Sequence, residues 1–370
     1  MKHDWEWRSF EACLEKVIYT KKLQSSDYLS EGKHPVVSQE EGLISGFWNN
    51  DDDIFEITKP LVIFGDHTRV LKYINFNFVL GADGVKILQP IDDIRAKFLY
   101  YYLKWFNVPS LGYSRHYKLL KECSVPVPSL SVQQQIVSEL DKVSEIIEKK
   151  KQQVKELDNL AQSIFYDMFG DPVENEKGWE VKKTKDFGEV KIGPFGSLLH
   201  KSDYISGGIP LVNPIHMRDG KIFVDNNFTI SESKAKELSS YLMQEGDFVF
   251  ARRGEIGRCA IVRNCDNGCL CGTGSLFVRF SQMMDRLFLR YVVNSKSFVA
   301  ELVDKAKGAT MLNINCGIVE ELRIPNPPLS LQQAFAEKVE GIERQKELIT
   351  ASIKEAETLF DSRMEYWFGE

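Results

Sequence analysis

Pro128-Ser129-Leu130-Ser131-Val132-Gln133-Gln134 is the stretch that decides the fold, because the chain contains it twice. The second copy, Pro327-Pro328-Leu329-Ser330-Leu331-Gln332-Gln333, lies 199 positions further along. The match continues without an insertion to residue 370, so that Phe169-Gly170-Asp171 returns as Phe368-Gly369-Glu370. This repeat is far longer than the period of a solenoid, and it therefore predicts a tandem of two domain-sized halves.

Both copies begin with the signature of a helix start. Ser131-x-x-Gln134 and Ser330-x-x-Gln333 match the capping box, in which the serine and glutamine side chains bond free amides at a helix start. Prolines just before each serine favour an extended backbone ahead of the helix. Each helix is expected to end at its Phe-Gly pair, where glycine can adopt the left-handed conformation.

After each start, apolar residues recur at alternating spacings of four and three, which is typical of a coiled-coil seam. Lys150 interrupts the seam in the first copy, and Lys346 and Arg363 interrupt it in the second. The seam residues that we expect to pair the helices are Ile136, Leu140, Val143, Ile147, Val154 and Leu157 in the first copy, and Val339, Ile342, Ile349, Ile353 and Phe360 in the second.

Two arrangements of these helices fit the pattern. Either copy could be an ordinary long helix of a globular core. We favour pairing of the two copies, because repeated units tend to be related by a pseudo-two-fold axis, which would run the helices antiparallel. A helix of roughly 38 residues, at about 1.5 Å per residue, is about 57 Å long, so such a pair would hold the intervening segments apart.

The segments between the helices have a different residue pattern, with short β-like runs, aromatic residues and turn residues. Apolar runs at 61–64 and 247–250 each lead into a polar loop, as a strand would. We therefore predict an α+β fold with two related globular domains and two long helices in an antiparallel coiled coil. The predicted boundaries are 1–127 for the first domain, 128–171 for the first helix, 172–326 for the second domain and 327–370 for the second helix.

Composition is that of an ordinary globular protein, with 43% apolar and 27% charged residues. The sequence shows neither an apolar run of ~18 residues nor a signal-peptide pattern, and its seven cysteines read as reduced thiols, so we expect a cytoplasmic protein with no membrane partner. The net charge of −6 argues mildly against a nucleic-acid partner. Net charge reports solubility and steering rather than local chemistry, so a basic surface is not excluded.

Together, these motifs resemble the specificity (S) subunit of type I restriction–modification systems, in which each half pairs a target-recognition domain with a spacer helix. The resemblance begins with the duplicated stretch and covers essentially the whole chain. Upstream of the two copies lie Gly112-Tyr113-Ser114-Arg115 and Gly308-Ala309-Thr310-Met311. The second half opens with Gly178-Trp179-Glu180, followed by the glycine loop at 192–197.

This resemblance implies a non-catalytic protein that binds double-stranded DNA. Each recognition domain would read one half of a bipartite, asymmetric DNA site, and the helices would fix the spacing between the halves. The helices would also dock two methyltransferase (M) subunits, through which restriction (R) subunits join the complex. The chain itself would hold no cofactor, since S-adenosylmethionine is bound by the M subunit.

Basic and hydroxyl side chains on loops are the candidates for DNA contacts, because Lys and Arg bind phosphates while Arg, Asn and Gln also read bases. Such loops occur at matching places in both halves, although each could be an ordinary solvated surface loop. The candidates in the first half are His67, Arg69, Arg115, His116 and Lys118. Those in the second half are Ser197, Lys201, Arg252, Arg253, Arg258, Lys307, Thr310 and Asn313.

Two further motifs have simpler explanations. Asn326-Pro327-Pro328-Leu329 is similar to a motif of amino-methyltransferases but lacks its aromatic residue, and we interpret it as the approach to a helix. Cys265 and Cys269 have the spacing of one zinc knuckle, but no second pair follows, so we expect thiols and no metal. Two other functions stay open: a coiled-coil protein-interaction scaffold without sequence-specific DNA binding, and an enzyme with its own methylation or nuclease activity.

Overall fold

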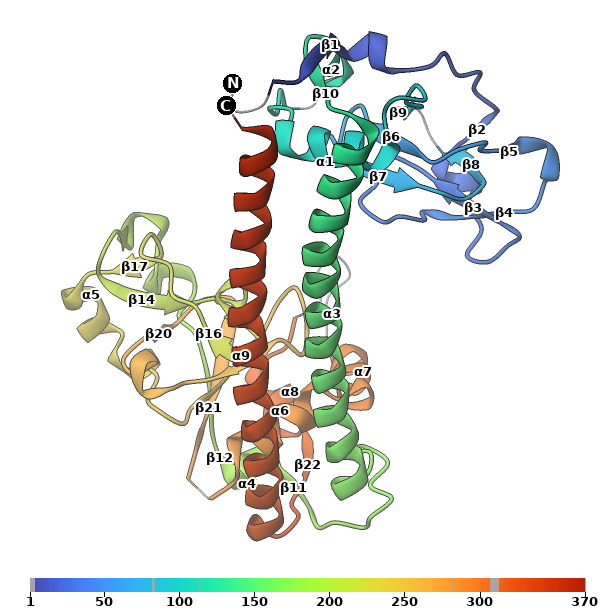
Figure 1. The fold of residues 1–370 in the computed structure, drawn as a ribbon. Helices are drawn as coiled ribbons and strands as arrows, with labels where there is room; N and C mark the ends of the chain where they lie inside the picture. Colours follow the sequence, from blue (N-terminus) through green and yellow to red (C-terminus); the bar gives the residue numbers. More distant parts are fainter. Residues whose placement is uncertain (1–3, 82–83, 113, 282, 307–312, 370) are drawn as a thin grey trace. The chain divides into compact units, whose positions relative to one another are not determined.

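The computed structural model describes residues 4–81, 84–112, 114–281, 283–306 and 313–369. The chain forms two compact units: unit 1 contains Met1–Gln152 and Ile349–Glu370, and unit 2 contains Gln153–Leu348. Two 40-residue helices, α3 (Leu130–Phe169) and α9 (Leu329–Phe368), each contribute one half to each unit (Figure 1). None of the helices in these described stretches is long and apolar enough to cross a membrane.

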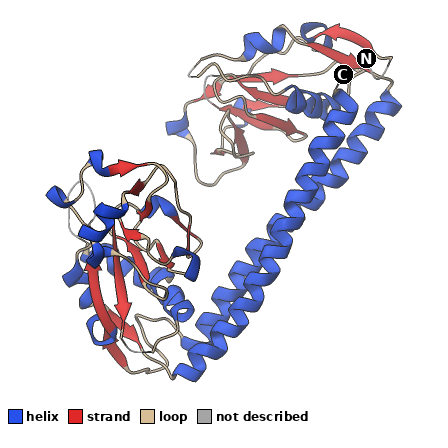
Figure 2. Ribbon diagram, turned by 90° about the vertical axis from the view of Figure 1, so that its left-hand side faces the viewer, coloured by secondary structure: helices blue, strands red, loops and turns tan. Residues whose placement is uncertain are grey.

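The two long helices pack antiparallel, which confirms the predicted fold class. In unit 1 the first half of α3 lies alongside the second half of α9, and in unit 2 the remaining halves do the same (Figure 2). The helices begin 199 positions apart, as the repeat predicts. Gly170 follows α3 with a φ of +74°, so the predicted left-handed stop is confirmed there.

The predicted capping boxes are wrong, because each helix begins two residues earlier than the predicted cap requires. Helix α3 already includes Leu130 and α9 already includes Leu329, so Ser131 and Ser330 lie inside the first turn. The preceding Ser129 places its hydroxyl 3.5 Å from the amide nitrogen of Val132. The glutamine that serves the helix start is the one before the predicted residue in each copy.

Gln133 and Gln332 are equivalent, fully buried residues that tie each long helix to its own domain. The Gln133 Oε1 accepts the Arg95 amide at 2.8 Å, and its Nε2 donates to the carbonyls of Asp93 and Pro128. The Gln332 Oε1 accepts the Asp285 amide at 2.9 Å, and its Nε2 donates to the Pro327 carbonyl. Arg95 and Asp285 immediately precede the helices α1 (Ala96–Phe106) and α6 (Arg286–Asn294). Each glutamine therefore joins the starts of two helices.

The domain of unit 1 contains a small antiparallel pair and two larger sheets. Strand β1 (Glu6–Ser9) pairs with β10 (Ser124–Val127) beside the short helix α2 (Tyr117–Lys121). One of the larger sheets is antiparallel and has the order β7 (Leu71–Ile74), β6 (Leu61–Gly65), β9 (Val85–Leu88). Helix α1 packs on strands β6 and β7 of this sheet. The mixed sheet has the order β2 (Lys22–Leu23), β8 (Phe78–Gly81), β3 (His34–Val37), β4 (Gly46–Trp48), with β5 (Ile54–Phe55) also on β8.

The domain of unit 2 repeats this plan with more strands. Strand β11 (Val181–Lys183) pairs with β22 (Arg323–Pro325), and a hairpin joins β15 (Met217–Arg218) to β16 (Lys221–Ile222). One sheet has the order β12 (Gly188–Ile192), β21 (Ser275–Phe280), β18 (Phe248–Ala251), β19 (Cys259–Ile261). The other has the order β13 (Tyr204–Ile205), β17 (Thr229–Ile230), β14 (Ile209–Val212), β20 (Leu270–Cys271). The shorter helices are α4 (Thr184–Phe187), α5 (Glu232–Glu237), α7 (Lys296–Lys305) and α8 (Cys316–Glu320).

The repeat extends further upstream than the sequence motif indicates. Helices α2 and α8 begin 199 positions apart, as do strands β10 and β22. Each of these strands pairs with the first strand of its own domain. A short helix, a strand and a long helix therefore form one structural block that occurs twice.

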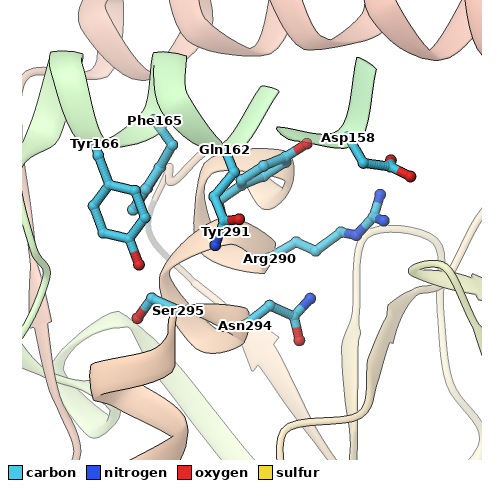
Figure 3. Close-up of a pocket in the computed structure, with 8 residues that line it drawn as sticks. All are labelled: Asp158, Gln162, Phe165, Tyr166, Arg290, Tyr291, Asn294 and Ser295. Carbon is cyan, nitrogen blue, oxygen red and sulfur yellow. The ribbon is translucent and has the colours of Figure 1, made fainter. Parts of the chain in front are cut away.

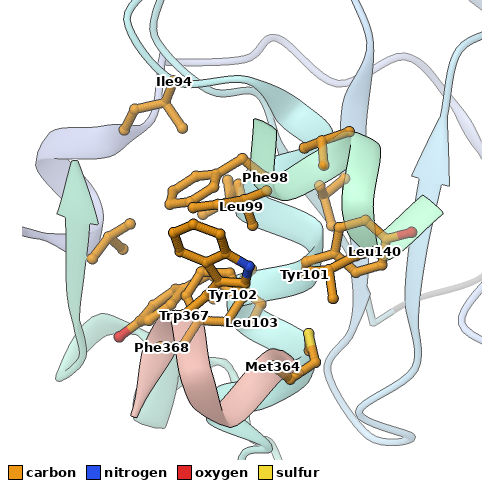
Figure 4. Close-up of a cluster of buried hydrophobic side chains, with 14 of the residues drawn as sticks. Ile94, Phe98, Leu99, Tyr101, Tyr102, Leu103, Leu140, Met364, Trp367 and Phe368 are labelled. Carbon is orange, nitrogen blue, oxygen red and sulfur yellow. The ribbon is translucent and has the colours of Figure 1, made fainter. Parts of the chain in front are cut away.

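In unit 1 the long helices share a core with the globular domain (Figure 4). Helix α1 contributes Phe98 and Tyr102, whose rings lie against Phe368 of α9, and Tyr101, whose ring lies against Phe360 of α9. The predicted seam residues in this cluster are Ile136, Leu140, Val143, Ile147 and Phe360, with Ile353 partly buried against it. The seam therefore faces α1 as well as the partner helix, which heptad spacing alone does not reveal.

In unit 2 the core between the helices is aromatic. Phe335 of α9 lies 5.7 Å from Phe165 and 5.4 Å from Phe169 of α3, between ring centroids. It also lies 5.0 Å from Tyr291 of α6. The predicted seam residues Val339 and Ile342 are buried in this cluster, Leu157 is partly buried against it, and Val154 is half-buried. Ile349, the first residue of the α9 half that belongs to unit 1, is also half-buried.

Two of the polar interruptions in the seam form ion pairs across the helices. Lys346 of α9 lies 2.5 Å from an Asp158 carboxylate oxygen of α3 in unit 2. In unit 1, Arg363 pairs with Glu139, which also accepts a hydrogen bond from the indole nitrogen of Trp367 at 3.0 Å. The charged breaks are therefore matched between the helices rather than left facing apolar residues.

The Glu139 pair predicts acid sensitivity of unit 1. Burial raises the pKa of Glu139, but hydrogen bonds from Arg363 and Trp367 outweigh it and hold that pKa below its ordinary value of 4.5. A carboxyl whose pKa is lowered by folding stabilises the fold above its unfolded pKa and loses this contribution as the pH falls through its folded pKa. We expect Glu139→Gln to lower the free energy of unfolding above about pH 5 and to matter progressively less toward about pH 3, as measured by urea unfolding.

The matched control is Glu355→Gln, which changes an exposed carboxyl on α9. We expect a loss of less than about 0.5 kcal/mol for this variant. An effect of Glu139→Gln that stays the same at every pH would contradict the ionic role of the pair.

Candidate nucleic-acid interface

In unit 2, loops from distant parts of the sequence meet at Arg252, the residue that follows β18. Its amide donates to the carbonyl of Gly274 at 2.9 Å, and its own carbonyl accepts the amide of Ile314 at 3.0 Å. Its side-chain Nε donates to Oδ1 of Asn313 at 2.9 Å. The two loops that carry the predicted DNA contacts Arg252 and Asn313 are thus joined, together with the glycine loop at 272–275, at a single residue.

A fourth loop reaches the same place through Phe195. The guanidinium carbon of Arg252 lies 5.9 Å from the centroid of the Phe195 ring, which is 54% exposed. The loop passes so close to the loop at Gly272 that a Cβ on Gly193 would lie 2.0 Å from the Gly272 carbonyl oxygen. Ser197 and Lys201, further along this loop, are exposed.

The Arg252 guanidinium is held in a partly desolvated environment. Burial lowers its pKa, and the nearby Arg253 lowers it further. Its Nη1 atom is buried and has no hydrogen-bond partner among the residues that the structure describes. Leaving a buried donor without an acceptor costs about 1–3 kcal/mol, so this arrangement favours a ligand that brings an acceptor.

The other basic candidates of unit 2 differ in whether their side chains are already bound within the protein. Arg253 is exposed. Arg258 is engaged within the protein, since it pairs with Glu255 and donates to the carbonyl of Pro214 at 3.1 Å. Lys307 and Thr310 lie outside the described residues.

Unit 1 repeats the same backbone framework around Asp66, the residue that follows β6. The Asp66 amide donates to the carbonyl of Gly84 at 2.7 Å, and the Asp66 carbonyl accepts the amide of His116 at 2.8 Å. The bond to Gly84 corresponds to the one between Arg252 and Gly274. The bond from His116 is one position further along the repeat than the bond from Ile314, because His116 directly precedes α2 whereas Ile314 lies two residues before α8. The strand end, the glycine loop and the segment before the short helix therefore meet in a similar way in both units.

The side chain at this shared position is different. The Asp66 carboxylate is buried, accepts the amide of Tyr117 at 2.8 Å, and lies 3.8 Å from the Lys86 ammonium. It thus serves the start of α2 within the protein. The same backbone position therefore carries an inward acid in unit 1 and a half-buried cation in unit 2.

His116 has a positioning role rather than the predicted DNA contact. It is fully buried, its Nε2 accepts the amide of Leu111 at 3.0 Å, and its Nδ1 lies 3.0 Å from the carbonyl oxygen of Asp66. Since both ring nitrogens are occupied inside the fold, the side chain cannot reach DNA in this conformation. It fastens the loop that carries Arg115 to the end of β6.

The remaining candidates of unit 1 surround this junction. Arg115 and Lys118 are exposed. Arg69 has a φ of +63° and donates from Nη1 to the carbonyl of Val108 at 2.9 Å, so part of its guanidinium holds the neighbouring loop. The His67 amide donates to the side chain of Gln39 at 3.2 Å.

Sequence reasoning missed Phe195, Asp66 and Gln39. Phe195 lies within the quoted loop at 192–197, but its contact with Arg252 depends on a residue 57 positions away. Asp66 and Gln39 gave no local signal either, because their roles depend on contacts with residues far away in the sequence.

A separate pocket of about 180 Å³ lies between α3 and α6 in unit 2 (Figure 3). Its lining is polar and aromatic and includes no histidine or cysteine. The residues of the pocket are Asp158, Gln162, Phe165, Tyr166, Arg290, Tyr291, Asn294 and Ser295. Across the described part of the chain, no group of three or more His, Cys, Asp or Glu side chains is placed to hold a metal ion.

Comparison with known families points to one kind of protein. A family model described as the type I restriction modification DNA specificity domain matches residues 3–157 and 176–358. The match covers both units and most of both long helices.

Individual relatives agree with this match. The type I restriction enzyme MjaVIII specificity subunit of Methanocaldococcus jannaschii is 23% identical over 389 residues, covering 96% of this chain and 89% of that protein. The MjaIX specificity subunit of the same organism is 27% identical over 284 residues, covering 70% of this chain and 65% of that subunit's length. The EcoR124I/EcoR124II specificity subunit of Escherichia coli is 22% identical over 93% of this chain and 88% of its own length.

Solved structures share the fold. The type I restriction–modification S subunit from M. genitalium has a TM-score of 0.56 and 14% identity, covering 98% of this chain and 95% of its own. A chain solved in work on assembly and conformational transition of the type I R-M system has a TM-score of 0.57 and 14% identity, covering 98% and 97%.

Proposed function

The chain belongs to the family of type I restriction–modification DNA specificity domains, and from this we propose that its two units read the two halves of a bipartite, asymmetric DNA site. As a specificity subunit it is the non-catalytic, DNA-recognising component of its system. Membership of this family argues against both alternatives, the protein-interaction scaffold without sequence-specific DNA binding and the enzyme with its own methylation or nuclease activity.

The observation that carries the proposal is the shared loop framework with different side chains. Asp66 and Arg252 occupy the same backbone position, yet one is an inward acid and the other a half-buried cation. Two sites built on one backbone with different chemistry are suited to two different sequences. Exposed cations beside each junction, such as Arg115 in unit 1 and Arg253 in unit 2, would bind phosphates and position the duplex.

The long helices would serve spacing and assembly. Each has 40 continuous residues, or about 60 Å at 1.5 Å per residue. In the proposed complex they separate the half-sites, dock two M subunits that carry S-adenosylmethionine, and through these recruit R subunits.

The direct test is co-expression with the M subunit of the same system, followed by mapping of methylated bases across a genome. We expect methylation at an asymmetric motif of two parts separated by a fixed number of base pairs. Methylation that does not depend on this chain, or failure to form a complex with M, would overturn the proposal.

A change in helix length tests the spacing role. Seven residues that continue the heptad pattern are inserted after Lys149 and after Leu348, which are equivalent positions of α3 and α9. The insertion adds about 10 Å, so we expect the gap between half-sites to grow by about 3 base pairs while both half-site sequences stay the same. A matched control inserts the heptad into α3 alone, which should misalign the pair and weaken methylation. A changed half-site sequence with an unchanged gap would reject the role of the helices as spacers.

A further inference from the structure

We propose that Arg252 reads a guanine in the half-site bound by unit 2, and that the ring of Phe195 supports the guanidinium against the base edge. This inference rests on the proposed function, and it assigns one base-reading residue to one half of the DNA site.

The first support is that the guanidinium is positioned before any ligand binds. Its Nε is held by the Asn313 amide oxygen at 2.9 Å, and the Phe195 ring lies 5.9 Å from its central carbon. The backbone of Arg252 is fixed on both sides by hydrogen bonds to Gly274 and Ile314. A side chain held in this way loses little conformational freedom on binding, which favours selective recognition of a base.

The second support is an unsatisfied donor. The Nη1 atom is buried and has no acceptor among the described residues, while Nε is paired with Asn313, so the guanidinium must shift to present Nη1 and Nη2 to a base; this shift breaks no hydrogen bond of Nη1. Guanine presents two acceptors, O6 and N7, at the major-groove edge, and their spacing matches the planar fork of arginine. A phosphate contact does not require a guanidinium held in place by other residues, since a flexible exposed cation such as Arg253 neutralises a phosphate equally well.

The third support is the contrast with unit 1. There the equivalent position holds Asp66, whose carboxylate accepts the Tyr117 amide inside the fold. A buried acid cannot donate to guanine, so unit 1 lacks this contact at the corresponding place. The inference therefore predicts a guanine requirement at this position of one half-site only.

The experiment uses the complex of this chain with its M subunits and short duplexes carrying the mapped site. Arg252→Gln should move the preference at one base pair of the unit 2 half-site from guanine toward adenine, because glutamine pairs with the adenine edge. Arg252→Lys keeps the charge but loses the fork, so discrimination at that base pair should fall by about 5- to 150-fold. The unit 1 half-site should be read unchanged by both variants, which also shows that the complex is folded.

A second measurement needs no variant of the protein. Each guanine of the half-site is replaced by 7-deazaguanine, which lacks the N7 acceptor. We expect wild-type binding to fall about 5-fold or more at the same base pair that Arg252→Gln alters. Phe195→Ala should reduce discrimination at that position too. Lys236→Gln, an exposed lysine of α5 replaced in the same unit, should leave it unchanged.

The outcomes separate the two levels of the argument. If the wild-type complex methylates a bipartite site but the Arg252 variants keep the same base preference, guanine reading is rejected while the proposed function stands. A uniform loss over all bases, with a salt dependence reduced by about one unit, would make Arg252 a phosphate contact and also overturn the inference. If the wild type recognises no bipartite site, the proposed function itself fails.

Discussion

Phe335→Ala is expected to destabilise unit 2 by about 3–5 kcal/mol, the range for deleting a fully buried phenylalanine. The Phe335 ring joins α9 to Phe165 and Phe169 of α3 and to Tyr291 of α6. Its loss leaves a cavity where the two long helices meet the recognition domain. Hydrogen–deuterium exchange followed by mass spectrometry should show faster exchange in α6 and in the unit 2 halves of α3 and α9.

Two controls define this effect. Leu348→Ala removes a side chain of α9 that is 73% exposed and should change stability by less than about 0.5 kcal/mol. Peptides of the unit 1 domain should exchange as in the wild type. Equal acceleration in both units, or none in α6, would show that Phe335 does not join the helices to the domain of unit 2.

The second large effect is expected at Gln133. Gln133→Met keeps the length of the side chain but leaves the Arg95 amide and the carbonyls of Asp93 and Pro128 without their partner. Each buried polar group left unpaired costs about 1–3 kcal/mol, and partial access of water should limit the total to about 2–4 kcal/mol. The amide of Arg95 should lose its protection from exchange, because its acceptor is removed.

The repeat supplies the controls for this prediction. Gln332→Met should produce the same change at the amide of Asp285 in unit 2, since that glutamine makes the equivalent bond. Gln134→Met, at the exposed neighbouring position, should be close to neutral. If Gln134→Met proved as damaging as Gln133→Met, the capping box inferred from sequence would be right after all.

Much of the architecture could be predicted because its signals are local or repeated. The constant offset predicted two equal helices, and the heptad spacing predicted that they pack together. The error in the helix starts has a physical cause, because Gln133 bonds to residues about 40 positions away and no local motif shows this. For the same reason, heptad spacing did not reveal that Ile136 and Leu140 share a core with α1.

The candidate interface was predictable only at the level of loops. Glycine-bearing basic loops identified the region around Arg252, but residue type did not distinguish Arg252 from Arg258, which is engaged within the protein. As a basic residue on a loop, His116 fits the sequence pattern of a DNA contact, but its side chain is fully buried. Burial and hydrogen bonding decide such cases, and both depend on tertiary structure.

The junctions at Asp66 and Arg252 are fastened by main-chain hydrogen bonds, which are the same whatever side chain the residue carries. Replacing that side chain leaves these main-chain bonds in place and removes a side-chain bond, from Asp66 to the Tyr117 amide or from Arg252 to Asn313. If the proposed function holds, we expect the sequence preference of the unit 2 half to change on substitution of side chains at the Arg252 junction, without a change of its backbone.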